Sequence, residues 1–205
     1  MANLTSICVY CGSANGSDPA YAAAAEEFGR ILAKSGIRLV YGGGSVGLMG
    51  ILARRVLAEG GRVTGIIPQF LKDREVMLTE VSELIVTPDM HERKRIMFER
   101  SDAFVALPGG IGTLEETVEM LTWAQLGRHA KPVVLANVKG FWNPLRDLLA
   151  HMESQGFLSK AFIGRSGDIP YYIVPTVAEV VPAVRAALAA QPPPTADARD
   201  AAKVM

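Results

Sequence analysis

The sequence of 205 residues has little of several features that define other protein classes. Its 21 basic residues equal its 21 acidic residues, so the formal net charge is zero. A nucleic-acid-binding protein needs uncompensated cations on one face, and the only dense basic run is 93–95, so we expect no nucleic-acid partner. No apolar run reaches the roughly 20 residues that span a bilayer, and no secretory signal is recognisable. We therefore expect a cytoplasmic protein without a membrane partner.

Cysteine and histidine are also scarce. Cys8 and Cys11 have the C-x-x-C spacing of redox-active pairs, but Cys8 lies inside an apolar run that indicates a strand. We favour a buried strand cysteine beside a loop cysteine over redox chemistry. The three histidines, His91, His129 and His151, have no metal-ligand spacing to one another, so we expect no metal cofactor.

Short apolar runs alternate with helical stretches along the chain. With 49% hydrophobic and 20% charged residues, this pattern predicts one α/β domain of repeated βαβ units around a parallel sheet. The predicted strands cover 4–10, 37–41, 62–67, 81–87, 103–107, 132–136 and 171–174. The predicted helices cover 19–35, 46–59, 90–100, 112–126, 141–155 and 176–190, and residues 69–80 resemble a loop. We expect the domain to span 1–190 and the tail 191–205 to be disordered, because the tail lacks apolar periodicity.

A first glycine turn lies between a predicted strand and helix at residues 41–50, YGGGSVGLMG. Gly42, Gly44 and Gly47 satisfy G-x-G-x-x-G, a pattern that lets a phosphate approach the N-terminus of a helix. A nicotinamide dinucleotide also needs an acidic residue at the end of the next strand, and that strand ends with the sequence IIPQ at 66–69. The turn therefore indicates either a nucleotide fragment or tight packing alone, and it argues against a nicotinamide cofactor.

A second glycine turn, PGGIGTLEE at 108–116, also leaves a strand and enters a helix. The N–H groups from Gly110 to Thr113, with the Thr113 hydroxyl, can cradle a phosphate at the positive end of the helix dipole. Glu115 and Glu116 follow, either as first-turn acids that stabilise the helix or as catalytic groups. A phosphate and a carboxylate at one helix start repel unless something separates them. The sugar of a nucleotide does so, with its phosphate at the glycines and its anomeric carbon near a carboxylate.

A third segment, DMHERKRIM at 89–97, supplies positive charge. On a helix, Arg93 and Met97 share one face while Lys94 and Arg95 point elsewhere. The three cations therefore cannot all reach one site.

These segments, with CVYCGS at 8–13, GIIP at 65–68 and TWAQLG at 122–127, resemble the Lonely Guy family of cytokinin-activating phosphoribohydrolases. The similarity runs from Ile7 to about Val174, and the family also carries an older label of lysine decarboxylase. The resemblance implies a Rossmann-like, doubly wound fold, usually in a dimer. It further implies hydrolysis of an N6-substituted adenosine 5′-monophosphate to free base and ribose 5-phosphate, with no metal or redox cofactor.

The resemblance also implies roles for individual residues. Arg93 and Glu116 are the implied catalytic pair: Glu116 can stabilise an oxocarbenium-like sugar, and Arg93 can stabilise the departing base or hold the phosphate. The implied nucleotide contacts are Glu75, Lys94, Gly109, Gly110, Ile111, Gly112, Thr113, Leu114, Glu115 and Thr122. This chain departs from the family pattern at 72–75, where Pro-Arg-Glu is frequent, and at Ile111, where Tyr is frequent.

Two other functions fit the same residues: a general purine nucleoside-monophosphate nucleosidase and a non-catalytic nucleotide-binding module. Amino-acid decarboxylation by pyridoxal phosphate does not fit, because no lysine has the context of a Schiff base. The predicted helix 112–126 places Leu114, Val118 and Leu121 on one face and further apolar residues on others, so part of its surface can meet a partner. We expect a homodimer with its site at the subunit interface, where Arg93 or Thr122 lies across from Glu116.

Overall fold

The computed structural model describes residues 4–72, 77–158 and 171–191. Within these residues the chain forms one seven-stranded parallel sheet in the order β4-β3-β2-β1-β5-β6-β7. The strands are β1 Ser6–Tyr10, β2 Arg38–Tyr41, β3 Val63–Pro68, β4 Glu83–Thr87, β5 Ala103–Ala106, β6 Val133–Ala136 and β7 Tyr171–Val174. The predicted α/β fold with a doubly wound parallel sheet is confirmed.

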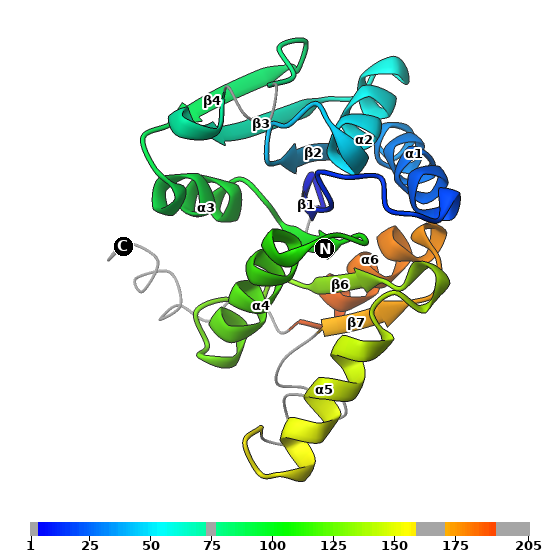
Figure 1. Ribbon diagram of the computed structural model, residues 1–205, viewed down its shortest axis with the longest axis vertical. Helices are drawn as coiled ribbons and strands as arrows, with labels where there is room; N and C mark the ends of the chain where they lie inside the picture. Colours follow the sequence, from blue (N-terminus) through cyan, green and yellow to red (C-terminus); the bar gives the residue numbers. More distant parts are fainter. Residues whose placement is uncertain (1–3, 73–76, 159–170, 192–205) are drawn as a thin grey trace.

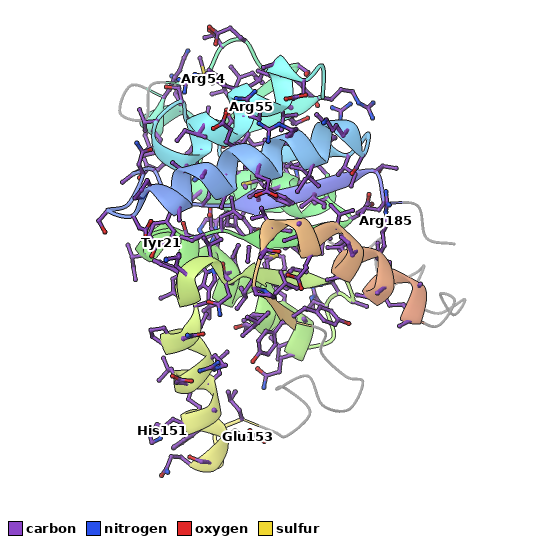
Figure 2. The ribbon with its side chains drawn as sticks, turned by 90° about the vertical axis from the view of Figure 1, so that its right-hand side faces the viewer. Tyr21, Arg54, Arg55, His151, Glu153 and Arg185 are labelled. Carbon is purple, nitrogen blue, oxygen red and sulfur yellow. The ribbon has the colours of Figure 1, made fainter. Side chains whose placement is uncertain are left out.

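Helices cover both faces of the sheet (Figure 1). The helices are α1 Pro19–Lys34, α2 Gly47–Ala58, α3 Met90–Glu99, α4 Ile111–Gln125, α5 Asn143–Ser154 and α6 Val180–Ala190. One core packs α1, α2 and α6 against the sheet, and a second packs α3, α4 and α5 against the other face. Figure 2 looks onto the first of these faces, with Arg54 and Arg55 labelled on α2; α5, which belongs to the other face, extends to the bottom of the view, where Glu153 is labelled. None of the helices in the described ranges is long and apolar enough to cross a membrane.

Residues along each strand alternate between the two cores, as the pleat of a strand requires. In β1, Ile7 and Val9 belong to the α1 side, whereas Cys8 and Tyr10 belong to the α4 side. Both Cys8 and Cys11 are buried free thiols, and burial raises the pKa of each well above its ordinary value. A thiol held protonated in this way is a poor nucleophile.

Most element ends differ from the predicted ones by one to a few residues, whereas β7 has its predicted bounds. Asp18, directly before Pro19, caps α1: its side chain accepts a hydrogen bond from the N–H of Ala20 at 2.8 Å. Pro68, predicted to follow β3, is its last residue and pairs with Thr87; a proline at this position can interrupt at most one ladder bond.

Three short 3-10 turns in the described residues were not predicted as separate elements. Short 3-10 turns, η2 Val138–Gly140 and η4 Val177–Glu179, precede α5 and α6, and a third, η1 Gln69–Leu71, lies within the predicted loop. The Gln191 side chain donates a hydrogen bond to the carbonyl of Ala130, so Gln191 contacts the domain although the sequence assigns it to the tail. The rest of that tail, 192–205, lies outside the described residues.

The order of the strands determines where a ligand can bind. From β1 the chain moves outward to β4 on one side and then from β5 to β7 on the other. In open parallel sheets, ligands bind beyond the carboxyl ends of the strands where the chain reverses direction. That point lies between β1 and β5, where both glycine turns and the first turn of α4 come together.

Candidate active site

The second glycine turn leaves the N-terminus of α4 open. The first bond of the helix runs from the N–H of Leu114 to the carbonyl of Gly110, at 3.0 Å. The N–H groups of Ile111, Gly112 and Thr113 have no acceptor among the described residues. A methyl group added at Gly110 or Gly112 would meet nothing within 4 Å. Three backbone donors at the positive end of a helix can therefore bind an anion.

Gly109 has a different role from its neighbours. A Cβ atom at Gly109 would lie 2.2 Å from Oγ1 of Thr113 and 2.8 Å from the backbone nitrogen of Gly12. Thr113 is 4% exposed, so its hydroxyl lies on the inner side of the turn. Gly109 is thus required by the packing of the protein, whereas Gly110 and Gly112 leave room for a ligand.

The first glycine turn is closed by the protein itself. The carbonyl of Gly12 accepts hydrogen bonds from the N–H groups of Leu48, at 3.0 Å, and Met49, at 3.3 Å. Gly47 has a φ of +60°, and a Cβ there would lie 2.2 Å from the carbonyl carbon of Ser13. Of the two interpretations of this turn, tight packing is the one that the structure supports, because the start of α2 already holds an acceptor.

Arg93 and Glu116 meet at the carboxyl edge of the sheet. Asp89 caps α3 by accepting a hydrogen bond from the N–H of Glu92 at 2.8 Å, which places Arg93 in the first turn of the helix. The guanidinium donates from Nε to the carbonyl of Ile66 at 3.2 Å, and its Nη2 lies 3.7 Å from Oε1 of Glu116. The exposed fractions of the two side chains are 8% and 13%. Arg93 therefore reaches Glu116 within its own subunit. The pair does not need an Arg93 from a partner subunit.

Lys94 binds two other acids of α4. Its Nζ lies 2.8 Å from Oε1 of Glu115 and 3.0 Å from Oε1 of Glu119. Burial alone would lower the pKa of Lys94, but hydrogen bonds to these two carboxylates outweigh it and raise the pKa. Arg95 points to solvent and pairs with Glu92 on its own helix. The separation of the three cations is as predicted. Glu119 was missed, although its position one turn after Glu115 is the spacing at which two side chains share a face.

Other residues implied as ligand contacts lie apart from this pair. Ile111 is 82% exposed at the first position of α4, and Leu114 packs partly against the core. Thr122 is exposed and donates a hydrogen bond to the carbonyl of Val118 at 2.8 Å. It lies about 9 Å further along the helix than Glu116 and on a different face, so one subunit does not bring them together. Glu75 lies outside the described residues.

One face of α4 packs against the sheet. It consists of Thr113, Thr117, Met120, Leu121 and Ala124. Of the three residues predicted to share a face, Leu121 is buried, Leu114 is partly buried and Val118 is 40% exposed. Trp123 packs edge-on against Phe98 of the same subunit, with ring centroids 5.3 Å apart. Opposite the buried face lies the outer stripe of α4, formed by Ile111, Val118, Thr122 and Leu126.

The arrangement combines three backbone N–H groups open to a ligand, a fixed cation and a largely buried carboxylate. No group of three or more His, Cys, Asp or Glu residues that can hold a metal ion occurs in ranges 4–72, 77–158 and 171–191. The chemistry offered by these protein groups is charge stabilisation around an anionic ligand.

Comparison with known proteins identifies the family. A family model described as "possible lysine decarboxylase" matches residues 49–168. The chain is 51% identical over 154 residues to the cytokinin riboside 5′-monophosphate phosphoribohydrolase LOG of Oryza sativa subsp. japonica, covering 75% of this chain and 64% of that protein. It is 50% identical over 153 residues to LOG1 of Arabidopsis thaliana, which carries the same enzyme name, covering 75% of this chain and 72% of that protein.

Solved structures share the fold. The Moco carrier protein of Chlamydomonas reinhardtii superposes with a TM-score of 0.68 at 23% identity, covering 92% of this chain and 100% of that chain. The molybdenum cofactor binding protein of Rippkaea orientalis gives a TM-score of 0.64 at 20% identity, with coverage of 92% and 99%. At these identities the likeness concerns the fold alone. The match to the family model and the identity to the plant proteins show that this chain belongs to the Lonely Guy family.

Proposed function

We propose that this chain hydrolyses the N-glycosidic bond of N6-substituted adenosine 5′-monophosphates, giving the free base and ribose 5-phosphate. The observation that carries the proposal is the Arg93–Glu116 pair beside the open N-terminus of α4. The names of the rice and Arabidopsis relatives support the same reaction.

The geometry suggests how the groups act. The 5′-phosphate binds the N–H groups of Ile111, Gly112 and Thr113, which places the sugar over the first turns of α4. Cleavage of the N-glycosidic bond develops positive charge at the anomeric carbon, and the Glu116 carboxylate stabilises this charge and orients the attacking water. Arg93 either stabilises the negative charge on the departing base or holds the phosphate. Neither step requires a metal ion or redox cofactor.

The two glycine turns favour a monophosphate. The start of α4 is open, whereas the start of α2 already binds the carbonyl of Gly12. One open helix N-terminus can bind one phosphoryl group, so the turns do not provide the extended pyrophosphate site of a dinucleotide.

We also propose a homodimer that binds no nucleic acid and acts in the cytoplasm. The outer stripe of α4 supports the dimer, because Ile111 and Leu126 are 82% and 69% exposed and lie on one face of the helix. In such a dimer the stripe would carry Thr122 toward the partner subunit, whose site it completes.

One assay tests the activity. The purified full chain is incubated with AMP and with isopentenyl-AMP, and released base is measured by chromatography. Faster release from isopentenyl-AMP is the expected result. Equal rates would instead support a general purine nucleoside-monophosphate nucleosidase. Saturable binding of both nucleotides without release of base would show a non-catalytic binding module.

A further inference from the structure

We infer that Gly42, in the first glycine turn, is a positioning residue for the Arg93 guanidinium; the inference rests on the proposed hydrolase function. A Cβ atom at Gly42 would lie 2.2 Å from Nη2 of Arg93 and 3.4 Å from its Cζ. The next nearest atom, Sδ of Met49, would lie at an ordinary van der Waals distance of 3.5 Å. The close conflict is therefore with the group that faces Glu116.

The backbone does not itself require glycine here. Gly43 and Gly47 have φ values of +79° and +60°, a conformation that disfavours other residues, but Gly42 is outside that region. Alanine at position 42 is thus compatible with the local backbone. What it displaces is the end of a side chain.

Each nitrogen of the guanidinium has a contact. Nε donates to the carbonyl of Ile66 at 3.2 Å, Nη1 lies 3.6 Å from Sδ of Met90, and Nη2 donates to the carbonyl of Gly42 itself at 3.5 Å. A methyl group at Gly42 pushes Nη2 off this carbonyl, and the guanidinium cannot retreat without losing its other contacts. Its separation from Glu116, now 3.7 Å, must then change.

Gly42 accordingly differs from the other glycines of the two turns. An added Cβ atom at Gly47 would lie 2.2 Å from the backbone of Ser13. One at Gly109 would lie 2.7 Å from Cβ of Thr113 and 2.8 Å from the backbone nitrogen of Gly12, so substitution at either position disturbs the fold. Substitution at Gly42 disturbs a side chain, which moves more easily than backbone. The first glycine of the G-x-G-x-x-G pattern therefore serves the catalytic arginine rather than a phosphate.

The test compares Gly42→Ala, Arg93→Ala, the double variant and the control Gly61→Ala with the wild type. Position 61 lies away from the site, and a Cβ there would lie 2.7 Å from Cγ1 of Val56. We expect Gly42→Ala to stay folded by circular dichroism and to lower kcat about a hundredfold, with a smaller change in KM. Gly61→Ala should lower the melting temperature and keep kcat. Adding Gly42→Ala to Arg93→Ala should cause no further loss of kcat or melting temperature.

Two results would overturn the inference: a wild-type kcat in Gly42→Ala, or the same fractional loss of kcat in the presence and absence of Arg93. If the wild type releases no base, the proposed function fails, and the melting temperatures decide the positioning role separately. The positioning role is supported if Gly42→Ala lowers the melting temperature of the wild type but not that of Arg93→Ala. Additive changes of melting temperature in the double variant, or no change in Gly42→Ala, contradict the positioning role.

Discussion

Nη2 of Arg93 on α3 lies 3.7 Å from Oε1 of Glu116 on α4, and both side chains are largely shielded from water. Removing either member takes one charge contact away from the other, which lies in a partly buried place. The two residues sit beside the helix N-terminus that we propose binds phosphate. Their separate roles can be tested by variants that change one charge at a time.

Glu116→Gln should keep the fold and nucleotide binding but lower kcat by about two orders of magnitude or more, because the amide does not stabilise a developing positive charge. Release of base and binding of AMP are measured on the same preparation. Glu99→Gln is the control, since Glu99 is 51% exposed and pairs with Arg95 on the surface. Wild-type turnover in Glu116→Gln would contradict the assigned role.

Arg93→Ala should impair turnover severely, and Arg95→Ala should have a mild effect. Arg93 is buried against Glu116, whereas the side chain of Arg95 is 50% exposed and contacts Glu92 and Glu99. Exposed ion pairs contribute little to stability, about 1 kcal/mol or less. Steady-state kinetics and thermal unfolding of both variants check this, and equal losses of kcat would argue against the assignment.

His129 should make the fold less stable in acid. Burial lowers the pKa of His129 below its ordinary value of 6.5. Nδ1 accepts a hydrogen bond from the N–H of Lys131 at 3.1 Å, and Nε2 lies 3.0 Å from the carbonyl of Met120. A neutral ring with its proton on Nε2 makes both hydrogen bonds. Below pH 6.5 the unfolded chain takes up a proton that the folded chain does not. The free energy of unfolding therefore falls as the pH drops from 6.5 toward the folded pKa, and it is fully retained above 6.5.

Chemical unfolding from pH about 5 to about 8 measures this effect. His129→Gln should flatten the acid side of the curve, and His91→Gln, which changes an exposed residue, should leave it as in the wild type. An unchanged slope in His129→Gln would assign the pH dependence to other groups.

The protein should be a dimer through the outer stripe of α4. Leu126→Glu should yield monomers with reduced activity, because a charge on an apolar interface is costly and the partner completes the site. Leu148→Glu, at a 48% exposed position on α5, is the matched control. Light scattering and kinetics measure both, and a fully active 22.0 kDa wild-type monomer would exclude a shared site.

Activity should survive prolonged chelation and need no added NAD. The proposed chemistry uses Arg93, Glu116 and backbone N–H groups, and the start of α2 is occupied by a carbonyl. Base release after dialysis against a chelator is compared with that of the untreated enzyme. Loss of activity that one metal restores would refute this expectation.

Local patterns predicted much of the fold. Strand β7 has the predicted bounds, and Asp18 caps α1 directly before Pro19. A strand's apolar run and a helix cap can be read from the sequence because each depends on residues that are neighbours in the chain. Helical spacing also separated Arg93 from Arg95 correctly. The sequence did not show which side of α4 is buried, because hydropathy alone does not indicate that Thr117 faces the sheet while Val118 is 40% exposed.

The site was predictable only in part. The sequence showed two similar glycine turns, and it could not show which one is open, because the acceptor that closes the first turn comes from Gly12, far away in sequence. In the same way, the closeness of Gly42 to Arg93 joins residues that are 51 positions apart. Contacts of this kind depend on how strands are ordered in the sheet, which local periodicity does not specify.

The loop after β1 also limits how this scaffold can be redesigned. Gly12 donates its N–H to the carbonyl of Pro108 at 3.1 Å and gives its own carbonyl to the start of α2. A designer who wished to bind a dinucleotide would have to reroute this loop before changing any side chain, since no substitution removes a backbone carbonyl. Rerouting it would also remove the hydrogen bond to Pro108, so a second phosphate site could be gained only by weakening the support of the one that we propose.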